Sequence, residues 1–289
     1  MIAQQFDYTV AASVAEAVAL LQKHGDRARI LAGGHSLIPM MKLRLAMPEM
    51  LIDIGRITEL SYIKEESSYV QIGALTTHHA IESSVIVQRR CPALSEAAGL
   101  IGDIQVRNKG TIGGSIAHAD PAADYPASIL AFDAVVITIG PKGERQIPAS
   151  QFFLDLMTTA LEPNEIVRAI NVPTRTGRSA SAYVKMAQKA SGFAICGASA
   201  VVELDASGAL AHAAIGVTGV GNRAFRATET EKALHGRKPT AELLRAACEK
   251  AAGGVSALDD IHASAEYRLD LVRIFARRAL EKAIERAGN

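Results

Sequence analysis

Tryptophan is absent from this chain of 289 residues, and aromatic residues together make up 4% of it. Proteins that bind single-stranded nucleic acid stack bases on aromatic side chains, so this scarcity argues against such a role. An excess of one charge is lacking too, because 31 Lys and Arg residues nearly balance 30 Asp and Glu residues. The net charge of +1 gives no electrostatic reason to bind nucleic acid or an anionic membrane surface.

Cysteine is equally scarce. The three cysteines, Cys91, Cys196 and Cys248, lie far apart, and no two have the spacing of a zinc or iron–sulfur site. An odd, sparse set argues against a disulfide scaffold and fits a reducing compartment. The sequence shows no signal-peptide pattern and no apolar run of membrane-spanning length. We therefore expect a soluble cytoplasmic protein that binds no metal and no nucleic acid.

Periodic apolar patterns predict alternating helices and strands over the first half, as in an α/β or α+β domain. The first helix begins with a capping box, in which Ser13 is the N-cap and Glu16 lies three residues on. The expected helices span residues 14–24, 77–83, 92–100 and 125–132, and the expected strands span residues 29–32, 50–54, 69–75 and 135–139.

The pattern changes near Pro173, where longer strands begin. The sequence Asp205-Ala206-Ser207-Gly208 is a hairpin turn signal between two of them. Antiparallel strands followed by helices indicate an α+β arrangement. We therefore expect two domains, residues 1–172 and 173–289. The second would hold strands at 182–189, 194–204 and 210–217, and helices at 227–234, 240–252 and 265–286.

Two glycine-rich segments stand out in the first half, Ala32-Gly33-Gly34-His35-Ser36-Leu37 and Gly110-Thr111-Ile112-Gly113-Gly114-Ser115. Glycine adopts backbone angles closed to other residues, and we expect Gly113 and Gly114 to use them in a loop. Successive N–H groups in such a turn bind anions such as phosphate. Neither segment is a dinucleotide fingerprint or a P-loop. Each alone fits an ordinary glycine turn, but the pair predicts a ligand with two phosphates.

Several polar residues accompany the two segments. His35 and His118 are expected to be polar loop residues, and Asp120 and Asp124 suit a helix cap or a ligand hydroxyl better than acid–base catalysis. Lys185 is a lone cation in an apolar strand and would suit an anionic ligand if it faced a cleft.

The two segments, in this order and spacing, resemble the FAD-diphosphate loops of the medium subunit of molybdenum hydroxylases. The resemblance is strongest to the aerobic carbon-monoxide-dehydrogenase type, with xanthine dehydrogenase more distant, and it covers the whole chain. It implies an FAD-binding domain of the vanillyl-alcohol-oxidase type with two α/β subdomains. A C-terminal α+β domain with an antiparallel sheet and a helix bundle would follow, so the fold class is α+β.

The resemblance also implies which residues contact FAD. At Phe193 the carbon-monoxide type carries a tyrosine, and at Gly192 an acidic residue, so carbon monoxide becomes a weaker candidate substrate. The implied contacts are Ala32, Gly33, Gly34, His35, Ser36, Leu37, Thr111, Ile112, Gly113, Gly114, Ser115, Ala117, Asp120, Ala123, Asp124, Val167, Lys185 and Phe193.

The resemblance implies an oxidoreductase subunit with no catalytic residue of its own, which holds FAD non-covalently. Electrons would reach the FAD from a large molybdopterin subunit and a small subunit with two [2Fe–2S] clusters, in a dimer of heterotrimers. The partner faces are expected around residues 40–46 and 185–193. Two alternatives remain open: a self-contained flavin-dependent oxidase and a non-catalytic nucleotide-binding module. The substrate of the complex, an N-heterocycle, aldehyde, purine or carbon monoxide, is not encoded here.

Overall fold

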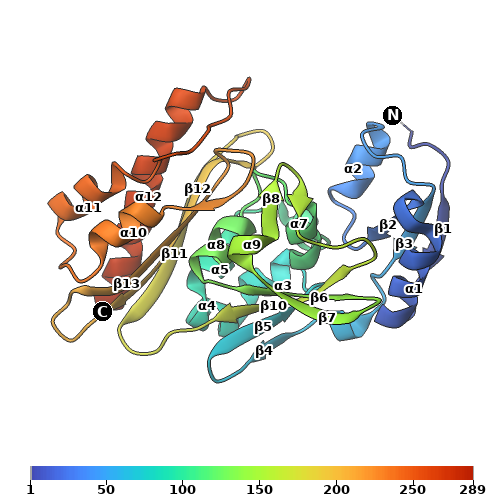
Figure 1. Ribbon diagram of the computed structural model, residues 1–289, viewed down its shortest axis with the longest axis horizontal. Helices are drawn as coiled ribbons and strands as arrows, with labels where there is room; N and C mark the ends of the chain where they lie inside the picture. The colour runs from blue at the N-terminus through green and yellow to red at the C-terminus, as the bar shows by residue number, and fades with distance from the viewer. Residues whose placement is uncertain (1, 289) are drawn as a thin grey trace.

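The computed structural model describes residues 2–288, which follow one another in three regions (Figure 1). An N-terminal subdomain lies at one end of the molecule, a second subdomain lies in the middle, and the C-terminal domain lies at the other end. The predicted α+β class is confirmed, because helices and separate sheets make up all three regions.

The N-terminal subdomain is a three-stranded parallel sheet with a helix packed against it. Its elements are β1 (Asp7–Val10), α1 (Val14–His24), the 3-10 turn η1 (Gly25–Arg27), β2 (Ala28–Leu31), α2 (Leu37–Lys42) and β3 (Met50–Asp53), and the strands pair in the order β1-β3-β2. The predicted capping box forms, because Ser13 Oγ accepts a hydrogen bond from Glu16 N at 3.2 Å. The Glu16 carboxylate accepts its hydrogen bond from Ala12 N at 2.7 Å, one residue before the N-cap, so the reciprocal half of the box is shifted by one position.

The second subdomain contains a five-stranded antiparallel sheet. Its strands are β4 (Ile63–Glu65), β5 (Tyr69–Gly73), β6 (Val135–Gly140), β7 (Gly143–Pro148) and β10 (Ile166–Pro173), in the order β4-β5-β10-β6-β7, and η2 (Thr58–Leu60) precedes them. The strand that comes last in the sequence therefore lies at the centre. Ile170 pairs with Ile72 on one side and Val136 on the other, and all three side chains are buried.

Helices cover one face of this sheet (Figure 1) and bury Ile81, Leu94, Ile116 and Ile129 against it. They are α3 (His78–Ser83), α4 (Val85–Arg90), α5 (Pro92–Gly99), α6 (Ile104–Arg107), α7 (Ile112–His118), α8 (Tyr125–Ala131) and α9 (Ala149–Phe152), and a small hairpin of β8 (Phe153–Asp155) and β9 (Thr158–Thr159) follows.

The C-terminal domain is an antiparallel sheet with helices on its outer face. Its elements are β11 (Ser179–Ala187), β12 (Ala194–Leu204), β13 (Leu210–Thr218), β14 (Phe225–Arg226), α10 (Thr228–Leu234), α11 (Ala241–Cys248) and α12 (Ala265–Gly288). The inner face presents Tyr183, Val201 and Ala214 to the core of the second subdomain, against α5 and α8. Within residues 2–288, no helix combines the length and the apolar character needed to cross a membrane.

Candidate cofactor-binding site

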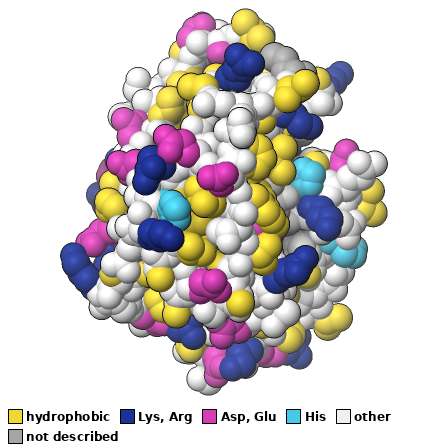
Figure 2. All heavy atoms as spheres, turned by 90° about the vertical axis from the view of Figure 1, so that its right-hand side faces the viewer, with side chains coloured by type: hydrophobic (Ala, Val, Ile, Leu, Met, Phe, Trp, Pro, Cys, Tyr) yellow, Lys and Arg dark blue, Asp and Glu magenta, His cyan; other side chains and the backbone are white. Residues whose placement is uncertain are grey.

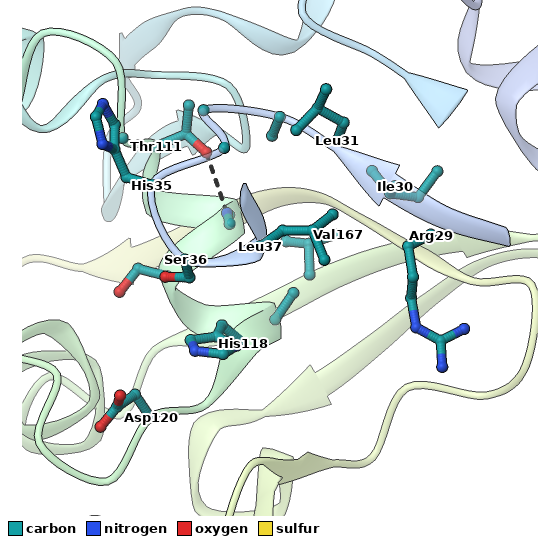
Figure 3. A pocket seen from close by; sticks show the side chains of 18 of the residues that line it. Arg29, Ile30, Leu31, His35, Ser36, Leu37, Thr111, His118, Asp120 and Val167 are labelled. Carbon is teal, nitrogen blue, oxygen red and sulfur yellow. Dashed lines mark hydrogen bonds between the residues drawn. The ribbon is translucent and has the colours of Figure 1, made fainter. Parts of the chain in front are cut away.

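A cavity of about 910 Å³ lies between the N-terminal subdomain and the second subdomain, and it reaches the loop between β11 and β12 (Figure 3). This volume falls at the upper end of the roughly 300–1,000 Å³ typical of ligand pockets. Both glycine-rich segments line it, although 72 residues and several elements separate them in the sequence. The structure therefore brings the two segments together at one cavity, as binding of a single ligand by both would require.

The first turn, residues 32–37, follows directly from the end of β2. Gly34 has φ of 76°, a left-handed backbone that favours glycine. A Cβ on Gly33 would lie 2.2 Å from the carbonyl oxygen of Lys109, so the turn touches the chain that leads into the second segment. Within residues 2–288, no group accepts a hydrogen bond from the N–H groups of residues 33–36. These residues line the cavity, so their N–H groups are available to an anion bound there.

The second segment, residues 110–115, differs from the expected loop because most of it is the first turn of α7. Thr111 is the N-cap, and its Oγ1 accepts a hydrogen bond from Gly114 N at 3.1 Å. The N–H of Gly113 donates to Ala74 O at 2.9 Å, and that of Ile112 donates to Thr76 O at 3.1 Å. The backbone N–H groups of Gly110 and of residues 112–115 are therefore used inside the protein.

The prediction that Gly113 and Gly114 adopt left-handed angles is wrong, because both have helical backbones. Glycine is needed for space instead. A Cβ on Gly113 would lie 2.5 Å from Ala74 Cβ and 2.7 Å from Ala74 O, so helix α7 sits directly on the end of β5. A Cβ on Gly114 would meet only Thr111 Oγ1, at 2.9 Å, and would otherwise project toward Ala32 and the cavity.

Further polar groups line the cavity beyond α7. The Oδ1 of Asp120 accepts a hydrogen bond from Ala122 N at 2.8 Å, which fixes the turn, and the carboxylate keeps acceptor capacity for a ligand hydroxyl. Burial lowers the pKa of His118, against the opposite effect of Asp120, so this histidine is neutral at pH 7. In Figure 3, Ser36, His118 and Asp120 lie near one another on one side of the cavity.

Asp124 does not cap α8, although it occupies the N-cap position. Its carboxylate instead accepts a hydrogen bond from Tyr183 OH at 2.6 Å and lies 2.8 Å from Lys185 Nζ. Burial raises the pKa of Asp124 to about 6, although Lys185 and Tyr183 both stabilise its ionised form. The expected helix cap does not form. An unpaired buried charge costs more free energy than an uncapped helix end, so the carboxylate pairs with Lys185 instead.

Most residues that the sequence nominated border the cavity. The exceptions are Ile112, which is buried in the core, and Lys185, which is buried beside Asp124. The sequence interpretation missed Arg29, in the first half of β2, and His78, which lies next to Gly110. Arg29 could have been found as a cation in the strand that leads into the first turn. The other missed lining residues come from distant parts of the chain and include Ile101, Gly102, Val106, Met157 and residues 163–166.

The cavity fits FAD in size and in chemistry. Its free N–H groups suit a diphosphate, and Thr111, Ser115 and Asp120 offer hydrogen-bonding groups for phosphate or ribose oxygens. A side chain at Gly114 would come within 2.9 Å of Thr111 Oγ1 and would otherwise occupy the space between the two segments.

Comparison with known proteins identifies the family. The sequence profile of the FAD-binding domain in molybdopterin dehydrogenases matches residues 4–175, and that of the carbon monoxide dehydrogenase flavoprotein C-terminal domain matches residues 181–283. The chain belongs to this family of FAD-binding medium subunits of molybdenum-containing dehydrogenases and hydroxylases. The predicted family and the predicted function as an FAD-dependent oxidoreductase subunit are confirmed.

Individual relatives match the medium subunit over almost its full length. The chain described here is 44% identical to the carbon monoxide dehydrogenase medium chain of Hydrogenophaga pseudoflava, and the match covers 100% of both chains. It is 39% identical to the 6-hydroxypseudooxynicotine dehydrogenase complex subunit alpha of Paenarthrobacter nicotinovorans, covering 98% of this chain and 95% of the relative. A solved structure of the Hydrogenophaga carbon monoxide dehydrogenase superposes with a TM-score of 0.96 at 45% identity, covering 99% of each chain.

Proposed function

We propose that this medium subunit passes electrons from iron–sulfur clusters of a partner chain through FAD to an external acceptor. Bound FAD supplies the redox chemistry, and the protein binds and orients it. The observation that carries the proposal is the shared cavity, in which both glycine-rich segments and the β11–β12 loop meet. No residue of this chain is needed as a nucleophile or general base.

The residues that would hold FAD divide by chemistry. The N–H groups of the first turn would bind the diphosphate, together with the Thr111 and Ser115 hydroxyls. Asp120 would accept a hydrogen bond from a ribose or ribityl hydroxyl. Val167 and Phe193 would make apolar contacts. The remaining lining contacts would be Ala32, Leu37, Gly113, Gly114, Ala117 and Ala123.

The boundary between the FAD-binding domain and the C-terminal domain would fall between residues 172 and 173.

The substrate would be bound by a partner chain. Relatives similar over their full length are named for carbon monoxide, for 6-hydroxypseudooxynicotine and for glyceraldehyde. Medium chains this alike in complexes with such different substrates support a substrate site elsewhere. The assembly would contain a large molybdopterin subunit and a small [2Fe–2S] subunit, as a dimer of heterotrimers. A cytoplasmic location fits the three cysteines, which are free and buried.

One partner face would be α2 and the segment after it. Leu43, Leu45 and Met47 are more than half exposed there, with Lys42 and Arg44 among them. Figure 2, which views the N-terminal end of the molecule, shows hydrophobic side chains beside Lys and Arg. Contiguous apolar patches on a protein surface often mark interaction sites. The second predicted face, residues 185–193, needs a correction. The Lys185 side chain is buried, and only the end of this segment near Phe193 reaches the surface.

The test compares the FAD-loaded chain alone with the chain reconstituted with its molybdenum- and iron-containing partners. Candidate substrates and an artificial dye are supplied, and reduction of the dye is followed. Turnover only in the assembly supports the proposal, and rapid turnover by the chain alone would establish the self-contained oxidase. Acid precipitation should release the yellow cofactor into the supernatant, because the linkage is expected to be non-covalent.

A further inference from the structure

Lys185 lies on β11, where the C-terminal domain meets the second subdomain, and its ammonium group is fully engaged. Nζ donates hydrogen bonds to Leu100 O at 2.7 Å and to Gly192 O at 2.6 Å, and it lies 2.8 Å from Asp124 Oδ1. An ammonium group has three donors, so none remains for a ligand. The side chain is 3% exposed and does not border the cavity.

The two carbonyl groups belong to segments that are distant in sequence and adjacent in space. Leu100 follows α5 and leads to Gly102, and Gly192 lies in the loop between β11 and β12. A Cβ on Gly192 would lie 3.6 Å from Gly102 Cα, so the two segments touch. Residues 101–102 and 191–193 border the same end of the cavity.

We propose that Lys185 is a positioning residue that ties these two segments together and so fixes the end of the cavity bordered by Phe193, without contacting the cofactor itself. Asp124 neutralises the buried ammonium, and the Tyr183 hydroxyl holds the carboxylate in place. The inference rests on the proposed FAD site. It reassigns Lys185 from the direct contact that the family resemblance implies to a contact between two parts of the chain.

Stability alone does not account for this arrangement. A buried ion pair is weak evidence of stabilisation, because desolvation offsets most of the attraction between the charges. The pKa of Asp124, raised to about 6 by burial, shows that this cost is only partly recovered. What the ammonium adds is the pair of hydrogen bonds to carbonyl groups on both sides of the domain junction.

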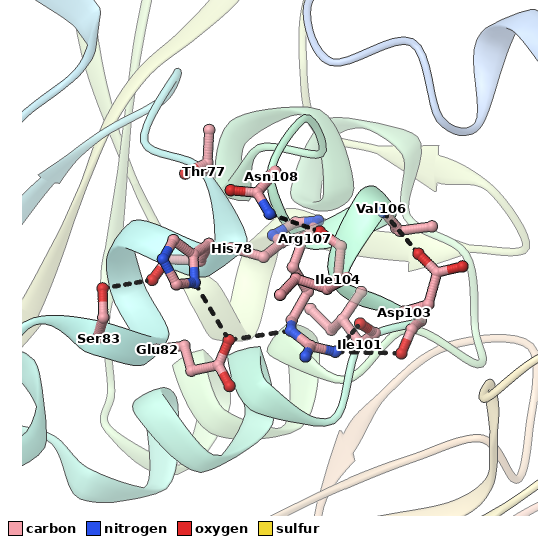
Figure 4. A network of polar contacts seen from close by, with 12 residues as sticks. Thr77, His78, Glu82, Ser83, Ile101, Asp103, Ile104, Val106, Arg107 and Asn108 are labelled. Carbon is pink, nitrogen blue, oxygen red and sulfur yellow. Dashed lines mark hydrogen bonds and ion pairs between the residues drawn. The ribbon is translucent and has the colours of Figure 1, made fainter.

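A second tether on one of the two segments provides an independent test. Arg107 Nη1 donates to Ile101 O and to Gly102 O, each at 3.2 Å, while its Nε donates to Glu82 Oε2 at 2.9 Å (Figure 4). Arg107 therefore holds residues 101–102 through carbonyl groups other than the one that Lys185 binds. Loosening it should disturb the same end of the cavity while leaving the Lys185–Asp124 pair in place.

The first experiment uses the FAD-free full chain and two variants, Lys185→Met and Lys185→Met/Asp124→Asn. The single variant leaves Asp124 without its cation and should lower Tm, whereas the double variant should recover most of the loss because no buried charge remains. Hydrogen–deuterium exchange should be faster in peptides covering residues 100–108 and 188–193 in both variants. Wild-type exchange in these peptides of the double variant would overturn the proposal, whether or not FAD binds.

The second experiment measures the dissociation constant and the visible circular dichroism of bound FAD. We expect both Lys185 variants to weaken binding by at least about tenfold, equivalent to 1.4 kcal/mol, and to change the flavin spectrum. Arg107→Met should change the spectrum in the same direction, whereas Arg89→Met, which breaks only an exposed pair with Glu65, should not. An unchanged spectrum in Arg107→Met would favour direct contact of Lys185 with FAD and overturn the positioning role. Absence of FAD binding by the wild type would instead contradict the proposed function, and the exchange experiment would still decide the role of Lys185.

Discussion

The first turn and the second segment carry the same pair of adjacent glycines, but the two backbones use them for different purposes. In the first turn, Gly34 supplies a left-handed conformation and the N–H groups stay free for a ligand. In the second segment, Gly113 and Gly114 are helical, their N–H groups are bonded within the protein, and the missing side chains provide space. A glycine pair in a sequence therefore marks a close approach or an unusual conformation, and only the tertiary structure decides which.

The largest effect is expected for Gly113→Ala, because the added Cβ would lie within 2.7 Å of two Ala74 atoms, one of them in the backbone. Neither helix α7 nor strand β5 can move without disturbing the core, so we expect a loss on the order of 3 kcal/mol in the free energy of unfolding. Urea denaturation measures it. Gly114→Ala is the matched control, and an equal loss in that control would mean that crowding at Ala74 is not the cause.

The second segment should also be the more acid-sensitive of the two, because a buried histidine supports it. His78 N donates to Gly110 O at 3.0 Å, and burial lowers the pKa of His78 to about 4. Below pH 6.5, His78 binds a proton in the unfolded chain but stays neutral in the folded chain. The free energy of unfolding therefore falls as the pH drops from 6.5 toward 4. We expect about 2 kcal/mol to be lost by pH 5 from this group.

The measurement is Tm against pH for the wild type and His78→Gln, which should have a shallower acid decline. Asp124 acts in the opposite direction. Its raised pKa makes the folded chain bind a proton more readily between about pH 4 and 6, so Asp124→Asn should steepen the decline. Parallel curves for His78→Gln and the wild type would contradict the assignment.

A smaller effect is expected for Gly34→Ala. The left-handed φ of 76° costs an L-residue about 1 kcal/mol, and the new Cβ would meet only the ends of the Ile38 and Leu31 side chains. The unfolding midpoint should therefore fall slightly while the core stays intact. Near-ultraviolet circular dichroism and urea denaturation check both points. No loss of stability would show that the first turn adopts another conformation in solution.

For Gly114→Val, the expected effect is larger on FAD binding than on the stability of the fold. The side chain would project between the two segments, where the cofactor is proposed to lie, so FAD content should fall sharply while Tm of the FAD-free chain changes by no more than a few degrees. The flavin-to-protein absorbance ratio is the readout. A normal flavin content would remove the second segment from the site.

The sequence predicted most helices and strands, but it did not predict the contacts between residues that are distant in the chain. Apolar periodicity located α1, α5, α8 and the long strands of the C-terminal domain, because those signals are local. The role of Gly113 could not be predicted, since the atoms that exclude a side chain belong to Ala74, far earlier in the chain. The Asp124–Lys185 pair joins residues 61 positions apart, and nothing near either residue announces the other.

The central place of β10 has a consequence for biosynthesis. The hairpins β4–β5 and β6–β7 leave the ribosome first, and each can pair only within itself, because β10 is the strand that joins β5 to β6. Until residues 166–173 emerge, two strand edges remain open to other chains, which is the condition under which sheets aggregate. A nascent chain stalled before this strand is therefore expected to depend on chaperones, whereas one that has passed it can close its sheet at once.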